Sequence, residues 1–350
     1  MSLLPFVRAT KHAIRRAAIR GGLEAFSLFR HVLPDRSGRA VIFTLHHVRP
    51  PRGEAFHPNA PLEVTPQFLE DAIKTVKAAG YTLVHAEDLA DLLADKSDTR
   101  KFAAFTLDDG CRDNFDFAYP VFKAHNAPFT IFVTAGFAER TRTMWWLTAE
   151  ELLRARDSVT FDFGAGAETL PTATPMQKAV AFDRFADFLL KMDEDKAVAA
   201  IDDYARASGV DPMAIVARET MDVATLRELA RDPLVRYGAH TLTHPNLARV
   251  APERLARELT GAADRIEEYV GKRPRALAYP YGMKEVVGAR EAEAARNAGY
   301  RIAVTTQPGI LTSDSLATAT YLPRVSLNGY FQEPRYVLAL ISGVPFALMK

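Results

Sequence analysis

The chain has 350 residues, of which 48% are hydrophobic and 25% charged, and this ordinary composition excludes a disordered, collagen-like or coiled-coil protein. A formal net charge of +1, from 44 basic and 43 acidic side chains, gives no reason to expect nucleic acid as a partner. The single cysteine, Cys111, excludes an intramolecular disulfide and a zinc site built from cysteines, and we expect it to be a small buried packing residue.

The first 40 residues are strongly basic, with eight lysines and arginines against two acidic residues. Arginines interrupt every apolar stretch of this segment, so it does not look like a secretory signal, and we expect a cytoplasmic protein. Residues 1–38 are predicted to form a basic amphipathic helical extension. Such a helix either packs on the domain or lies on an anionic membrane surface, which would make the protein peripheral to the inner membrane.

Short apolar strands alternate with amphipathic helices over the remaining domain, residues 39–350. Strands are predicted at 40–45, 81–84, 102–107, 129–133, 234–237, 276–278, 302–305 and 322–327. Helices are predicted at 66–79, 87–94, 115–125, 252–270 and 284–298. This alternation indicates an α/β protein with a parallel sheet, and seven or eight units favour a TIM-like barrel over an open sheet.

Residues 147–230 break this alternation. They are predicted to be helical at 149–156, 176–190 and 195–206, with a polar stretch at 157–175. We interpret them as a helical insertion between two units of the barrel.

Chemistry in a barrel of this kind collects where the strands end. Four predicted strand ends carry unusual polar residues: His46-His47, Asp108-Asp109-Gly110, His240-Thr241-Leu242-Thr243-His244 and Tyr279-Pro280-Tyr281-Gly282. On a helical turn, the four-residue spacing of His240 and His244 would place both imidazoles on one face. With one carboxylate from the Asp108-Asp109 pair they would form a three-ligand site with an open position. That site is typical of catalytic zinc, although the same ligands also suit iron oxygenases.

Three of these motifs resemble those of the NodB-like polysaccharide deacetylases, carbohydrate esterase family four. Residues 106–110 (TLDDG) resemble the family's TFDDG motif, residues 240–244 (HTLTH) match H-[ST]-x-x-H, and residues 278–282 (AYPYG) resemble RPPYG. The resemblance covers about residues 38–330, including 144–146 and 322–324, which recur in one bacterial branch. It implies a deformed (β/α)₇ barrel, in agreement with the alternation of strands and helices.

The resemblance also implies a role for each matching residue. Three residues would bind a divalent metal, most often Zn²⁺: Asp109, His240 and His244. Asp108 would be the catalytic base, and the backbone N–H of Tyr281 would help to form the oxyanion hole. Pro280 and Tyr281 would line the sugar groove.

The chain departs from the family at two positions. Ala278 stands where the family has an arginine that orients the base, and Arg324, at the end of a late strand, is our candidate for that charge. An ordinary structural ion pair is the alternative role for Arg324.

The second departure concerns the general acid, because no histidine follows His244 to form the usual Leu-x-His motif. In some relatives that deacetylate poly-N-acetylglucosamine, a Tyr-His at the end of the first strand serves instead, and Leu45-His46 resembles it. In a closed barrel the first and last strands are neighbours, so His46 can reach the same cavity. We expect His46, rather than His47, to protonate the leaving amine, with His47 beside the substrate.

The function implied is a metal-dependent hydrolase that removes an N-acetyl group from an amino sugar of an oligo- or polysaccharide and releases acetate. Trp146 is expected to stack on a sugar ring, with packing as the alternative. Two other functions stay open. One is deformylation or deacylation of a lipid-linked sugar, which the basic extension would suit. The other is a metal-bearing sugar-binding protein without turnover, against which Asp108 argues, since it would serve only the chemistry.

Overall fold

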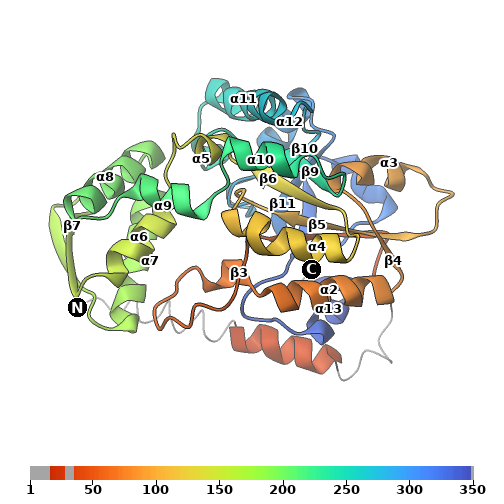
Figure 1. Cartoon of the computed structure of the whole chain (residues 1–350), viewed down its shortest axis with the longest axis horizontal. Coiled ribbons are helices and arrows are strands. Elements are labelled where there is room, and N and C mark those ends of the chain that lie inside the picture. Colours follow the sequence, from red (N-terminus) through yellow and green to blue (C-terminus); the bar gives the residue numbers. More distant parts are fainter. Residues whose placement is uncertain (1–15, 28–34, 348–350) are drawn as a thin grey trace.

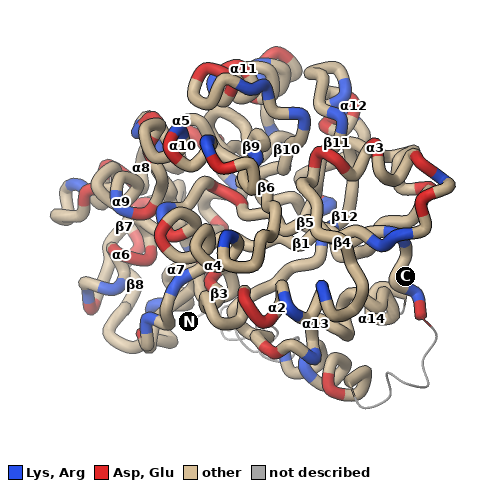
Figure 2. Tube along the Cα trace, turned by 45° about the vertical axis from the view of Figure 1, so that its right-hand side comes forward, with Lys and Arg blue, Asp and Glu red and all other residues tan. Residues whose placement is uncertain are grey.

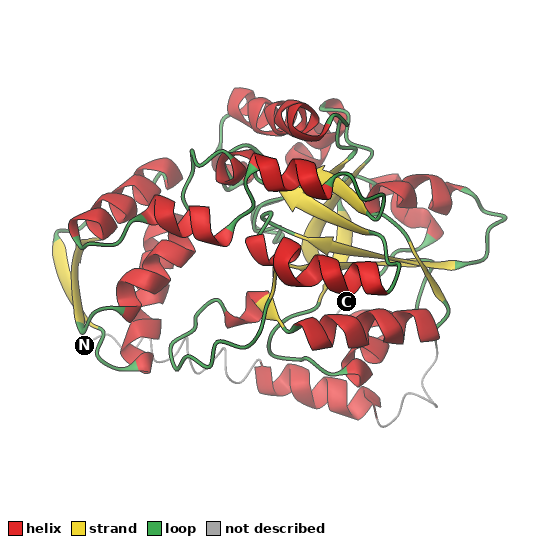
Figure 3. Ribbon diagram, in the orientation of Figure 1, coloured by secondary structure: helices red, strands yellow, loops and turns green. Residues whose placement is uncertain are grey.

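Seven parallel strands close into a barrel in the computed structural model, which describes residues 16–27 and 35–347 (Figures 1 and 3). Their order around the barrel is β1 (Ala40–Leu45), β12 (Leu322–Ser326), β11 (Ile302–Pro308), β10 (Ala276–Ala278), β9 (Val235–Ala239), β6 (Phe129–Val133) and β5 (Lys101–Leu107). The ring closes because β5 pairs with β1, while β4 (Tyr81–Leu83) pairs with the first residues of β5. The predicted α/β class and (β/α)₇ barrel are confirmed.

The strands are apolar on both faces because each face is covered. Along β1, Ala40 and Ile42 belong to the cluster that fills the barrel, whereas Val41 and Phe43 belong to the cluster under the outer helices. All six residues of β1 are buried, as is usual for strands of a parallel sheet with helices around it.

Helices surround the barrel and join its strands (Figure 3). They are α2 (Pro66–Ala78), α3 (Leu89–Ala94), α4 (Tyr119–Ala124), α5 (Ala135–Ala138), α11 (Pro252–Val270), α12 (Ala289–Asn297), α13 (Pro334–Ile341) and α14 (Val344–Ala347). Thr65 caps α2 as predicted, since its side chain accepts a hydrogen bond from the Phe68 N–H. The helix predicted at 284–298 starts later, because Glu291 accepts from the N–H of Gly288 and fixes the helix start there.

The surface helices carry charges of both signs. In the view of Figure 2, basic and acidic residues are interspersed along α11 and α12. This mixture agrees with the near-zero net charge of the chain.

The insertion has a hydrophobic core of its own. It consists of α6 (Trp145–Arg154), β7 (Ser158–Asp162), β8 (Ala167–Pro171), α7 (Pro175–Lys191), α8 (Glu194–Ala207) and α9 (Pro212–Glu219), and lies at the left of Figure 1. Buried residues between Met144 and Val216 form most of this core, to which Phe56 and Phe137 are added from outside the insertion, whereas α10 (Val223–Leu229) packs on the barrel through Leu226 and Leu229. The polar stretch at 157–175 contains the β7–β8 hairpin, which the sequence reading missed.

Part of the basic extension packs on the barrel domain. Residues 16–27 are helical, and Leu23 and Phe26 are buried against Tyr336 and its neighbours on α13. Ile19 of the same helix is 42% exposed. The rest of the predicted extension, residues 1–15 and 28–34, lies outside the described residues, and so does its expected contact with a membrane. Among the described helices, none combines the length and the apolar character needed to cross a membrane.

Candidate active site

The predicted polar residues meet at one end of the barrel, because each follows or ends a parallel strand. They come from five strands or the loops after them: His46 after β1, Asp108 and Asp109 after β5, His240 and His244 after β9, Tyr281 after β10, and Arg324 on β12. All of these side chains except His46 and Tyr281 are buried.

Asp109, His240 and His244 form a compact group whose ligand atoms all lie within 4.8 Å of one another. Oδ1 of Asp109 lies 3.4 Å from Nε2 of His240 and 3.6 Å from Nε2 of His244. Neither contact has hydrogen-bond geometry, so this buried oxygen has no hydrogen-bond partner among the described residues. An unpartnered buried carboxylate oxygen is costly, and a cation placed among the three side chains would compensate it. The residues present therefore fit a divalent metal ion.

The two histidines are not on a helical turn, contrary to the interpretation of their spacing. Residues 240–244 form a loop in which Thr241 has a φ of 67° and His244 a φ of 56°. Glu258 of α11 accepts hydrogen bonds of 2.9 Å from the backbone N–H groups of Leu242 and Thr243. The backbone is thus satisfied by a side chain instead of by helical bonds, and the imidazoles converge through left-handed turns.

Hydrogen bonds and burial set the state of the two imidazoles. Nδ1 of His240 lies 2.7 Å from the carbonyl oxygen of Ala278, to which it donates, so its Nε2 faces Asp109. Burial lowers the pKa of His240, but the adjacent carboxylate of Asp109 outweighs burial and raises it overall. Burial lowers the pKa of His244 to about 3, so its imidazole is neutral, the form that binds a metal.

Arg324 donates two parallel hydrogen bonds to the carboxylate of Asp108. Its Nη1 lies 2.7 Å from Oδ1 and its Nη2 2.6 Å from Oδ2 of Asp108, while its Nε donates to the carbonyl oxygen of Thr305 at 2.8 Å. The Arg324 side chain has no exposed surface. Burial raises the pKa of Asp108, but the charge of Arg324 outweighs it and lowers the pKa overall, so the carboxylate is ionised.

The side chains of His46 and His47 point in different directions and have different neighbours. Nε2 of His46 lies 3.9 Å from Oδ2 of Asp108, and its side chain keeps 21% exposure. Burial is the main cause that lowers the pKa of His46, and the charges of Asp108 and Asp109 oppose it. His47 is buried with Nδ1 2.8 Å from Asp113 and Nε2 3.7 Å from the sulfur of Cys111. Both of its ring nitrogens face protein groups, so His47 is not placed to contact a substrate, contrary to expectation.

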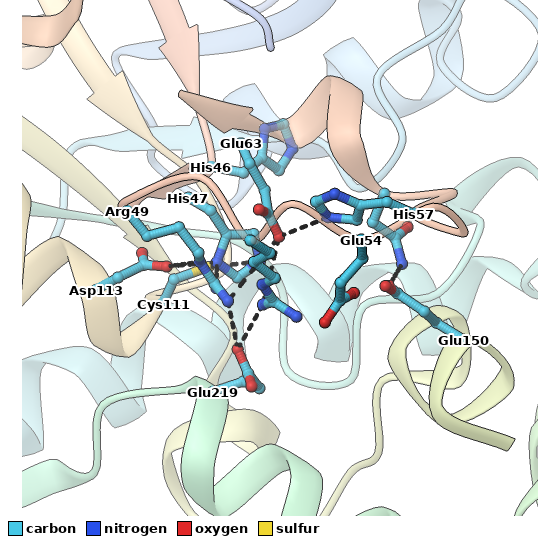
Figure 4. Close-up of polar contacts among 12 residues, drawn as sticks. His46, His47, Arg49, Glu54, His57, Glu63, Cys111, Asp113, Glu150 and Glu219 are labelled. Atoms are coloured by element: carbon cyan, nitrogen blue, oxygen red, sulfur yellow. Dashed lines mark hydrogen bonds and ion pairs between the residues drawn. The ribbon is translucent and has the colours of Figure 1, made fainter. Parts of the chain in front are cut away.

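His47, Cys111 and Asp113 also have metal-ligand spacing, but their surroundings argue against a metal. Figure 4 shows Arg49 between Asp113 and Glu219, and Arg49 is hydrogen bonded to both carboxylates. Asp113 therefore already has a cation, and burial raises the pKa of the Cys111 thiol so that it stays protonated. We interpret the group as structural, with Cys111 fully buried as predicted.

Tyr281 has a left-handed backbone with a φ of 61°. Among the described residues, no backbone or side-chain acceptor takes a hydrogen bond from its N–H. Gly282 follows with a φ of 64°, and a Cβ there would lie 2.6 Å from the backbone nitrogen of Thr306. Only glycine fits at that position, and the close approach holds the Tyr281 loop against β11.

Aromatic rings surround His244. The ring centres of Tyr281, Trp146 and Phe137 lie 5.0, 5.2 and 5.7 Å from that of His244. The indole N–H of Trp146 is buried and has no hydrogen-bond partner among the described residues. Pro280 is buried. Trp146 thus lies beside the group of Asp109, His240 and His244 and also belongs to the core of the insertion, so its contact with a sugar ring stays a prediction.

Sequence reasoning missed Glu194, the first residue of α8. Its carboxylate accepts hydrogen bonds from the Tyr281 hydroxyl at 2.8 Å and from the Asn246 N–H at 2.6 Å. A glutamate in the first turn of a helix is common for electrostatic reasons, so the sequence offers no signal that this one reaches the barrel.

Several solved structures share the fold. A deacetylase from Streptococcus pyogenes, PplD in complex with acetate, is 18% identical with a TM-score of 0.57, over 86% of this chain and 97% of that chain. IcaB from Ammonifex degensii is 17% identical with a TM-score of 0.54, over 86% and 97%. A de-N-acetylase from Aggregatibacter actinomycetemcomitans is 14% identical with a TM-score of 0.53, over 83% and 95%. At these identities the likeness concerns the fold alone, and no curated protein matches the chain.

A family model described as polysaccharide deacetylase matches residues 95–303, more than half of the chain. The matched region contains both carboxylates of the 106–110 motif, the histidine loop and the 278–282 motif. The resemblance inferred from these motifs is thereby confirmed. The chain belongs to the polysaccharide deacetylase family.

Proposed function

We propose that this protein is a metal-dependent hydrolase that removes an N-acetyl group from an amino sugar of an oligo- or polysaccharide and releases acetate. The observation that carries the proposal is the buried group of Asp109, His240 and His244 with an unpartnered carboxylate oxygen, next to a separately held Asp108. A divalent ion in this group, which we take to be Zn²⁺, would polarise the amide carbonyl and lower the pKa of a bound water to about 7.

Asp108 is the proposed general base. Arg324 keeps it ionised and fixes the plane of the carboxylate. Oδ2 also accepts from the Thr44 hydroxyl, whereas Oδ1 accepts from Arg324 alone among the described residues and keeps a free lone pair for a water proton. Asp108 is not among the three grouped ligand residues, so its carboxylate is left to act as a base while it pairs with Arg324. The separation of Asp108 from the three proposed metal ligands favours an enzyme over a sugar-binding protein without turnover.

His46 is the proposed general acid for the leaving amine. Its imidazole is neutral near pH 7, because burial lowers its pKa. Nε2 of His46 lies 3.9 Å from Asp108, beyond direct hydrogen-bond reach, so one water between them would carry the proton taken by Asp108 to His46, and His46 would give it to the amine nitrogen as the C–N bond breaks. The exposed edge of His46 is the side from which a sugar amine would approach.

Tyr281 and Trp146 are the proposed contacts to the acyl group and the sugar. The free N–H of Tyr281 would donate to the oxyanion that forms when water adds to the carbonyl carbon. The unpaired indole N–H of Trp146 gives it a hydrogen-bond donor as well as an aromatic face, and buried Pro280 would help to shape the groove.

The test is acetate release from a panel of N-acetylated oligosaccharides and lipid-linked amino sugars. We expect the wild type to release acetate from at least one member. Asp108→Asn and His46→Ala should each retain Zn²⁺ but lose roughly 10²- to 10⁴-fold in kcat, the usual contribution of a general base or acid. His125→Ala, which removes an imidazole paired with Glu70 on the surface, is the matched control and should keep full activity. No acetate from any substrate would refute the function, and undiminished turnover in either variant would refute that residue's role.

A further inference from the structure

Glu194 joins the insertion to the catalytic end of the barrel through both oxygens of a buried carboxylate. Oε1 accepts from the hydroxyl of Tyr281 at 2.8 Å, and Oε2 accepts from the backbone N–H of Asn246 at 2.6 Å. Only 9% of Glu194 is exposed. One side chain of the insertion thus holds two loops of the barrel, the loop after β10 and the loop after β9.

These two loops carry the residues around the proposed metal. Asn246 lies two residues beyond His244, and the ring of Tyr281 packs on the imidazole of His244 with 5.0 Å between centres. Tyr281 and His244 both have a positive φ, of 61° and 56°. Residues other than glycine keep such a conformation only where neighbouring contacts hold them in it. The bonds to Glu194 are contacts of this kind.

The burial of Glu194 has a cost that its two hydrogen bonds offset. Burial raises the pKa of Glu194, while the bonds from Asn246 and Tyr281 oppose that shift. Loss of either donor would leave a buried acceptor oxygen without a partner. The arrangement is therefore stable only with both loops in the positions that they occupy here.

The next residue, Asp195, serves as a comparison, because it also connects the insertion to the barrel. Asp195, the next residue of α8, pairs with Arg142 at 2.8 Å and with Arg254 of α11. Asp195 ties the insertion to the barrel, yet among the described residues it contacts neither Tyr281 nor the backbone of the histidine loop, which it reaches only through Arg254, 3.5 Å from the Thr243 hydroxyl. Asp195 and Glu194 thus form a matched pair for experiment.

We propose that Glu194 is a positioning residue that the insertion supplies to the active site. It holds the Tyr281 ring against His244 and fixes the loop that carries His244, and so sets the geometry of both the metal site and the Tyr281 N–H. This inference rests on the proposed function and adds that the insertion completes the site.

The test compares Glu194→Gln, Asp195→Asn and wild type by Zn²⁺ affinity of the metal-free protein, by kcat and KM, and by thermal unfolding. Glutamine keeps the size of glutamate but not its charge, and its one oxygen can accept from only one of the two loops, so the bond to the Tyr281 hydroxyl or to the Asn246 N–H is lost or, at the hydroxyl, reversed. We expect E194Q to weaken Zn²⁺ binding about tenfold and to lower kcat at least as much with little change in KM. D195N should lower the unfolding temperature yet keep Zn²⁺ affinity and kcat within about twofold of wild type.

Tyr281→Phe supplies an independent variant, since it removes the hydroxyl and keeps the backbone N–H. It should shift Zn²⁺ affinity and kcat in the same direction as E194Q, and the double variant should be no worse than E194Q alone. If E194Q does not fold, Y281F decides the question. Wild-type Zn²⁺ affinity and kcat in the folded variants would overturn the proposal, and so would equal losses in D195N. Zn²⁺ affinity is measured without substrate, so a wild type that releases no acetate would count against the proposed function alone.

Discussion

Arg324 and Asp108 form a fully buried ion pair, and their burial makes the loss of either partner costly for stability. Removing one partner of such a pair leaves an uncompensated charge, which typically costs about 3–5 kcal/mol of stability. Lysine in place of Arg324 would keep the charge but could not make both parallel hydrogen bonds. The pair is thus suited to hold a base in one orientation, the task that the family assigns to an arginine at the position of Ala278.

Arg324→Lys should therefore separate catalysis from metal binding. We expect kcat to fall at least tenfold, because Asp108 is no longer held in one plane, while the protein still binds one Zn²⁺ per chain. The measurements are steady-state kinetics, metal content and thermal unfolding, with Arg100→Lys as control, since Arg100 pairs with Asp98 on the surface. A folded R324K variant with wild-type kcat would assign Arg324 to structure alone.

Residue type determined which site residues could be predicted. The two carboxylates and the two histidines could be singled out because they match motifs of the family, and Arg324 because it is a charged residue on a predicted barrel strand; their roles stay predictions. The carbonyl oxygen of Ala278, which orients His240, was not, since a backbone group leaves no mark in the sequence. His47 was misplaced because successive side chains at a strand end point to opposite sides, so only His46 faces Asp108.

The segment between β2 (His47–Val48) and β3 (Glu63–Val64) also contacts the insertion, since Asn59 donates a hydrogen bond of 2.6 Å to Glu150 of α6. Figure 4 shows His57 of this segment directed at Glu63, with 3.1 Å between Nε2 and Oε1. The hydrogen bond to Glu63 is the largest cause that raises the pKa of His57. Burial opposes it, and the charges of Glu150 and Glu54 add to the rise.

The raised pKa of His57 makes its pairing with Glu63 dependent on pH. Its contribution is complete below the unfolded pKa of about 6.5 and is lost as the pH rises through the higher folded value. We expect His57→Gln to destabilise the protein by about 0.5–1 kcal/mol at pH 5.5 and by much less at pH 9. Urea unfolding of both proteins at one Zn²⁺ concentration measures this difference. In a Glu63→Gln background, the destabilisation caused by His57→Gln should no longer depend on pH. In the protein with Glu63, an equal destabilisation at both pH values would contradict the account.

Elements were predictable where their pattern was long or wholly apolar, as in the barrel strands and α11. The β7–β8 hairpin was not, because its strands have five residues each and β8 is mostly exposed, so its sequence resembles a polar loop. The separate core of the insertion was also hidden, since its buried aromatic residues could equally have packed on the barrel.

At the level of the whole molecule, closure of the barrel brings the residues of the site together. Asp109 and the histidine loop follow β5 and β9, which are both neighbours of β6, while β12 brings Arg324 to Asp108 through its pairing with β1. The sequence order of these segments does not predict that proximity unless the strands form a ring. The insertion then covers the same end of the barrel and supplies Trp146 and Glu194 to the site.

The central claim is that Asp109, His240 and His244 hold one divalent ion, and anomalous diffraction at the zinc edge from crystals grown with Zn²⁺ tests it most directly. We predict one strong peak at about 2.0–2.2 Å from Asp109 Oδ1 and from Nε2 of both histidines, and its loss in Asp109→Asn. Contradiction would be a wild-type crystal with no peak at these three atoms, or with its peak at His47, Cys111 and Asp113 instead.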